Sequence, residues 1–159
     1  MSANAPDAVI AVLAENLAEL SALLDAVRPA DLATRLGEDE WSVAEILLHL
    51  VHAERWMQPQ VLDLRQAVAP ALAVPAYEPV HLPEGDPPPE INELRWAVRA
   101  VREETLELLR GLTATHLREP GLLGDGEEAV DLSLRTMLLT IADHQLFHVR
   151  QIQRTLGRR

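Results

Sequence analysis

The chain has 159 residues, 48% hydrophobic and 25% charged, which suits one globular domain whose core needs no disulfide or metal to fold. Its formal net charge of −11 opposes binding to polyanions, so nucleic acids and anionic membranes are not expected as partners. The absence of cysteine excludes disulfides, thiolate metal ligands and a thiol nucleophile supplied by the protein itself.

The first predicted element is an amphipathic helix over residues 7–27. Its apolar side chains recur at steps of three and four residues: Val9, Val12, Leu13, Leu17, Leu20, Leu23 and Leu24. Pro29 and Gly37 then interrupt this periodicity, so a connector follows the helix.

A second helix is predicted to begin at the stretch "WSVAE". Ser42 and Glu45 have the three-residue spacing of a capping box, in which each side chain bonds the backbone N–H of the other, and Trp41 is placed as a hydrophobic staple. The apolar periodicity continues to about residue 68, with a bend expected at Pro59 because proline removes a helical hydrogen bond.

Residues 70–89 hold seven of the 11 prolines, which disfavours helix interiors and central strands there. This segment is predicted to be a long crossover connection within one domain. A third helix is expected over residues 90–110, with Gly111 as its C-terminal stop. Its apolar positions are Ile91, Leu94, Val98, Val101, Leu108 and Leu109.

A fourth helix is predicted from about Ser133 to Leu156, after a loop in which "EAVDL" has the character of a short extended piece. Four amphipathic helices of similar length most simply bury their apolar stripes against one another. The predicted fold is therefore all-α, a four-helix bundle in a single domain over residues 1–159. The sequence shows no signal peptide and no membrane-spanning run, so we expect a cytoplasmic protein.

Two histidines extend the apolar stripe of the fourth helix, so both imidazoles are expected to face the interior of the bundle. His144 and His148 are four residues apart, which corresponds to a rotation of about 40° and a rise of about 6 Å, so their imidazoles can converge on one metal ion. A third ligand should come from a facing helix. His49 lies at the edge of the buried stripe of the second helix, and His52 competes for the same role.

An inward-facing histidine is more often a hydrogen-bonded core residue than a metal ligand. Three neutral imidazoles in one core would each need a partner for a nitrogen lone pair, however, and one divalent ion satisfies all three. Both interpretations stay open from the spacing alone.

The stretches "WSVAEILLHLVHAE" and "DHQLFHVRQI", taken together, resemble the DinB-like family of four-helix-bundle metalloproteins, which includes the YfiT-type metal-dependent hydrolases. The resemblance spans the whole chain. It implies an up-up-down-down bundle with a long crossover between helices 2 and 3, a divalent metal held by His49, His144 and His148, and assembly as a homodimer.

The resemblance also implies two kinds of activity, because characterised members are thiol-dependent transferases and isomerases while others are described as hydrolases. We therefore expect a metal-dependent enzyme that acts on a small-molecule substrate. A Zn²⁺ or Ni²⁺ ion would activate either a water or an external low-molecular-weight thiol. The alternative is a non-catalytic small-molecule-binding or structural bundle, in which the histidines or the metal only stabilise the core.

Several polar residues close to the three histidines in sequence are weaker candidates. Gln151 and Asp143 are placed to orient an imidazole or a bound water. His52, Glu54 and Arg150 have no role that spacing alone assigns. A nucleic-acid-binding function, suggested only by the family's historical name, is opposed by the charge of −11.

Overall fold

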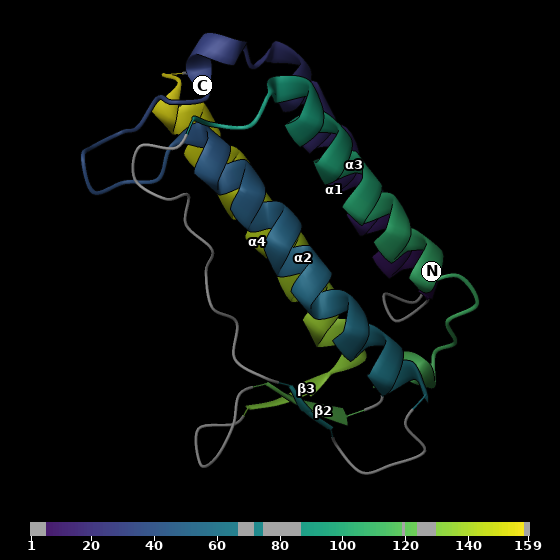
Figure 1. The fold of residues 1–159 in the computed structure, drawn as a ribbon. Helices are drawn as coiled ribbons and strands as arrows, with labels where there is room; N and C mark the ends of the chain where they lie inside the picture. The colour runs from purple at the N-terminus through teal and green to yellow at the C-terminus, as the bar shows by residue number, and fades with distance from the viewer. Residues whose placement is uncertain (1–5, 67–71, 75–86, 119, 124–129, 158–159) are drawn as a thin grey trace.

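The computed structural model describes residues 6–66, 72–74, 87–118, 120–123 and 130–157. Four long helices dominate it: α1 (Pro6–Ala26), α2 (Val43–Gln66), α3 (Ile91–Leu108) and α4 (Leu134–Thr155) (Figure 1). Each bound lies within two residues of its predicted position, so the all-α four-helix bundle is confirmed. None of the described helices is long and apolar enough to cross a membrane.

The directions of the helices differ from the arrangement that the family resemblance implied. One core cluster joins the end of α1, the starts of α2 and α3, and the end of α4, while a second cluster joins the opposite ends. Helices α1 and α4 therefore run one way and α2 and α3 the other (Figure 1). The bundle is up-down-down-up, and the expected up-up-down-down order is wrong.

Connector lengths and contacts explain this order. The segment between α1 and α2 contains the 3₁₀ turn η1 (Pro29–Asp31) and is fastened to the start of α2 by backbone bonds from Val43 N to Thr34 O (3.1 Å) and from Ala44 N to Leu32 O (3.0 Å). This segment therefore joins the end of α1 to the start of α2, which lie next to each other in the bundle. The connection from α2 to α3 must instead span the bundle length, because these helices are parallel. Most of that predicted crossover, residues 67–71 and 75–86, lies outside the described residues.

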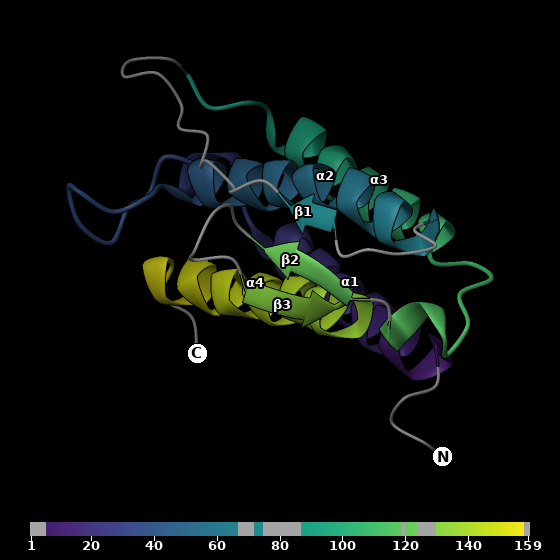
Figure 2. The ribbon, with the colours of Figure 1, turned by 90° about the horizontal axis from the view of Figure 1, so that it is seen from below.

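A small sheet accompanies α2 and α4 (Figure 2). Its strands β1 (Leu72–Val74), β2 (Pro120–Leu123) and β3 (Val130–Ser133) lie in that order, with β1 parallel and β3 antiparallel to β2. The extended character predicted for "EAVDL" is confirmed by β3 for its last three residues, and its first two lie outside the described residues. The pairing of β1 was not predicted; it is compatible with the neighbouring prolines because β1 is an edge strand.

The start of α2 has the predicted capping box. Ser42 N donates to Glu45 Oε2 (2.8 Å), and Glu45 N donates to Ser42 Oγ (3.2 Å). Arg35 adds an ion pair to the same carboxylate oxygen at 2.8 Å. Burial alone would raise the pKa of Glu45, but the hydrogen bonds from Ser42 and the contact with Arg35 outweigh it and hold the pKa below its ordinary value.

A layer of buried polar side chains ties the four helices together at mid-length. Arg102 of α3 donates from Nε and Nη2 to the Glu54 carboxylate of α2 at 2.7 and 3.0 Å, from Nη1 to Leu13 O of α1 at 3.0 Å, and from Nη2 to Gln145 Oε1 of α4. Gln145 Nε2 donates to Asn16 O (2.6 Å), and Asn16 Nδ2 donates to Ala142 O (3.0 Å). We call Asn16, Glu54, Arg102 and Gln145 the polar layer.

Replacing Arg102 by methionine should lower the free energy of unfolding by about 3–5 kcal/mol, because it leaves the buried Glu54 carboxylate without its counter-charge. Denaturant unfolding followed by circular dichroism measures the change. The matched control is Arg99→Met on the same helix, whose ion pair with Asp25 is exposed and should contribute less than about 1 kcal/mol. Equal losses in the two variants would show that the layer adds no stability.

Glu45→Gln should destabilise the fold by about 1 kcal/mol at pH 7, in the range of helix-capping effects. Because the folded-state pKa of Glu45 lies below the ordinary value of 4.5, its contribution is present above pH 4.5 and lost as the pH falls through the folded-state pKa. The difference between variant and wild type should therefore shrink in unfolding curves recorded at successively lower pH. A difference that is constant down to pH 3, or that matches the exposed control Glu104→Gln, would contradict this account.

Candidate metal centre

Three imidazoles from two helices meet at one point. His49 lies in the first half of α2, and His144 and His148 lie in the second half of α4, so the antiparallel packing of these helices brings them together. Nε2 of His144 is 2.8 Å from Nε2 of His49 and 3.1 Å from Nε2 of His148. One ring nitrogen from each residue lies within 4.8 Å of the other two. We call these three residues the histidine cluster.

The histidine cluster lies at the edge of the core. The buried positions of α4 are Leu134, Met137, Leu138, Ile141, Ala142, Gln145, His148, Val149 and Ile152. His49 and His148 are each 5% exposed, whereas His144 is only half-buried. The prediction that both α4 imidazoles continue the interior stripe thus holds fully for His148 alone. Part of His144 therefore reaches the surface of the protein.

Gln151 sets the orientation of one imidazole. Its Oε1 lies 2.7 Å from His148 Nδ1, and because an amide oxygen only accepts, Nδ1 carries the proton. The Nε2 lone pair of His148 is then directed at the other two histidines. A hydrogen bond of this kind commonly fixes the tautomer of a metal-binding histidine.

The imidazoles of α4 are neutral at pH 7. Burial, and secondly the charge of a protonated His148, lower the pKa of His144 to about 4. Burial also lowers the pKa of His148, although the hydrogen bond to Gln151 opposes the shift. Neutral rings keep the nitrogen lone pairs that a metal ion needs.

The spacing of the Nε2 atoms fits a shared cation. His148 Nε2 carries a lone pair, so it can only accept a hydrogen bond from His144 Nε2. A single proton on His144 Nε2 cannot form a good hydrogen bond to both His49 Nε2 and His148 Nε2. Tetrahedral zinc with Zn–N bonds of about 2.0–2.1 Å requires N···N separations of about 3.3 Å, somewhat longer than the 2.8 and 3.1 Å between His144 and its two neighbours. A small rotation of the rings would accommodate the ion.

Aromatic side chains flank the histidine cluster. The Trp41 ring centroid is 4.6 Å from that of His49 and 6.0 Å from that of His148, nearly parallel to the latter. Phe147 contacts His148 edge-on at 5.1 Å. Trp41 was predicted as a helix staple, and as a residue that packs in the core or lines a pocket. No spacing rule indicated its contacts with the histidines, because it precedes α2 and meets α4 only in the folded chain.

The weaker candidates separate clearly. His52 is half-buried and lies outside the histidine cluster, so the structure brings His49, and not His52, next to the two α4 histidines. Asp143 and Arg150 are exposed. Glu54 forms an ion pair with Arg102 in the polar layer. This ion pair was not predicted from the sequence. The sequence indicates it only through Arg102, a charged residue among the apolar positions of α3.

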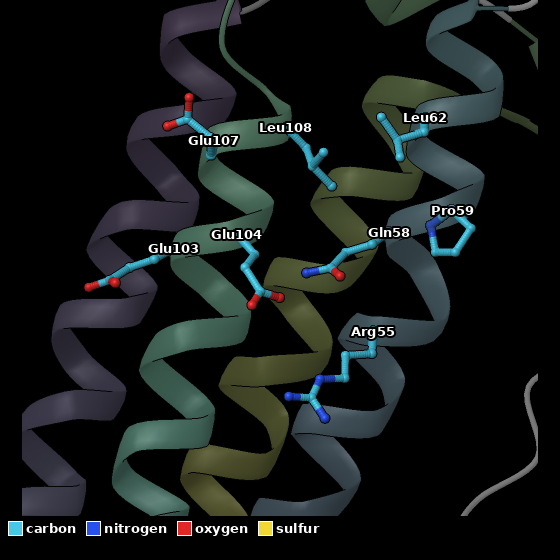
Figure 3. Close-up of a pocket in the computed structure, with 8 residues that line it drawn as sticks. All are labelled: Arg55, Gln58, Pro59, Leu62, Glu103, Glu104, Glu107 and Leu108. Carbon is cyan, nitrogen blue, oxygen red and sulfur yellow. The ribbon is translucent and has the colours of Figure 1, made fainter.

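A surface groove of about 630 Å³ lies elsewhere, between α2 and α3 (Figure 3). Arg55, Gln58, Pro59 and Leu62 line it from α2, and Glu103, Glu104, Glu107 and Leu108 line it from α3. None of the three clustered histidines contributes to it. It is an open groove rather than a second part of the candidate centre.

Comparison with known proteins agrees with this architecture. A search of curated proteins found no match. A solved structure, YfiT from Bacillus subtilis, described as "a probable metal-dependent hydrolase with an unusual four-helix bundle topology", superposes with a TM-score of 0.75 at 18% sequence identity, covering 100% of this chain and 91% of YfiT. At this identity the likeness establishes the fold. The sequence pattern of the DinB superfamily matches residues 12–152, and the chain therefore belongs to the DinB superfamily.

Proposed function

We propose that the protein is a metal-dependent enzyme in which His49, His144 and His148 hold one divalent ion, Zn²⁺ or Ni²⁺. The observation that carries this proposal is the convergence of three Nε2 atoms, with separations of 2.8 and 3.1 Å from the central His144. Imidazole nitrogen is a preferred ligand of both ions.

The bound ion would supply Lewis-acid activation, lowering the pKa of a water or thiol that it binds. Three protein ligands are the number typical of catalytic rather than structural zinc sites, because they leave a position for a reactant. The half-buried His144 gives that reactant a route from solvent. With a water as nucleophile the reaction is hydrolysis, as described for YfiT. With an external low-molecular-weight thiol the reaction is transfer, which remains the second candidate.

Other properties of the proposal rest on the sequence. The net charge of −11 supports a small-molecule substrate over a nucleic acid. Homodimer formation and a cytoplasmic location remain predictions.

Purified wild-type protein should bind about one equivalent of Zn²⁺ or Ni²⁺ per chain, measured by elemental analysis after dialysis. His49→Ala, His144→Ala and His148→Ala should each lose most of the ion, because two imidazoles bind weakly. The matched control is His52→Ala, one turn from His49 on α2 and outside the histidine cluster, which should retain it.

Failure of the wild type to take up either ion would overturn the proposal and favour structural histidines. If the ion binds and its loss only lowers the melting temperature, while loaded wild type converts no ester or amide with or without added thiol, the non-catalytic alternative is supported.

Gln151→Leu should weaken metal affinity by about 10–100-fold, the range for losing a partner that orients a ligand histidine. Gln151→Glu keeps an acceptor for His148 Nδ1–H and should retain the affinity. Competition titration with a chromogenic chelator measures both constants. Gln153→Leu, which lies about 200° around α4 from Gln151, is the control. Equal affinities for Gln151→Leu and this control would show that Gln151 does not position His148.

A further inference from the structure

Two of the few aromatic residues of this chain contact the histidine cluster. The chain has five, of which four lie in the described residues. Trp41 precedes α2, Trp56 lies two turns after His49 on the same face of α2, and Phe147 lies on α4. The fourth, Trp96, lies on α3. Trp41 and Phe147 thus lie against the histidine cluster.

Two of these rings enclose His148. Trp41 lies almost parallel to the imidazole, with an interplanar angle of 14°, and Phe147 meets it at 83°. Both rings therefore border the imidazole of His148, one of the three residues that would bind the ion. Trp41 is half-buried and packs against the core cluster that joins the starts of α2 and α3 to the ends of α1 and α4. Part of its ring surface is therefore buried by core packing.

Packing does not account for Phe147. Its side chain is 56% exposed, although it is the only phenylalanine of the sequence and lies one turn from the half-buried His144. An exposed apolar ring beside an accessible group of ligand atoms offers a surface on which a second flat apolar group can pack, by offset or edge-to-face contact.

We propose that the centre takes substrates that carry an aromatic or similarly flat apolar group, and that this group packs on Phe147 and Trp41. This inference rests on the proposed metal-dependent function. Phe147 is then a specificity-determining residue that binds substrate and takes no part in bond making or breaking.

The test compares two metal-binding probes of different shape, benzohydroxamate and acetohydroxamate, on zinc-loaded protein by calorimetric titration. For each variant, the dissociation constant of acetohydroxamate is divided by that of benzohydroxamate. Comparing this ratio between variants removes the difference in intrinsic zinc affinity of the two probes, because that difference is the same in every variant. Phe147→Ala should reduce the preference for benzohydroxamate by roughly two- to ten-fold, the range for one aromatic contact. Phe147→Tyr should preserve it.

The matched control is Trp96→Ala, since Trp96 is also exposed, at 69%, but lies on α3. This variant should keep the wild-type ratio. An unchanged ratio in Phe147→Ala would overturn the inference while leaving the metal site intact. An unchanged ratio together with loss of a dimer in sedimentation analysis would likewise overturn it, assigning Phe147 to self-association. If zinc-treated wild type binds neither probe and retains no zinc, the proposed function itself fails.

Discussion

The Arg102–Glu54 ion pair and its hydrogen bonds to α1 and α4 fix how each helix is turned about its own axis. Gln145 must face Arg102, and His144, one residue earlier, is rotated by about 100° toward α2. On α2, Glu54 faces α3 while His49, five residues earlier, is rotated by about 140° and faces α4. A charge buried at 1% exposure tolerates no other rotation, because an unpaired guanidinium or carboxylate would be left in the core.

The helix order then decides which histidines meet. In an up-down-down-up bundle the start of α2 lies beside the end of α4, so residues 49 and 148 reach the same level. In the up-up-down-down order the connection from α1 to α2 would have to span the bundle. The observed connector instead binds back to the first turn of α2 through Leu32 and Thr34. The short connector and the capping box beside it therefore place His49 within reach of His144 and His148 on α4.

Sequence reasoning recovered what is local and missed what depends on long-range partners. Apolar periodicity located four helices, and the Ser42–Glu45 spacing located the start of α2. The i, i+4 spacing of His144 and His148 located two of the three histidines of the candidate centre. The helix face left His49 and His52 as candidates for the third histidine, and the resemblance to the DinB-like family pointed to His49. The pairing of Glu54 with Arg102 spans 48 residues, and the sheet uses strands of three and four residues, so neither leaves a periodic signal.

The position of the histidine cluster also distinguishes a functional centre from a merely packed one. Leucine at these positions would bury apolar area without any lone pair to satisfy, and volume-conserving apolar replacements of buried polar groups are often neutral or stabilising. The chain instead holds three imidazoles with their Nε2 atoms directed at one another, one of them held by Gln151, at a point that His144 leaves open to solvent. The polar layer already supplies the specific contacts that fix the helices. The three histidines therefore form a cluster that could hold a metal ion, in addition to the contacts that fix the helices.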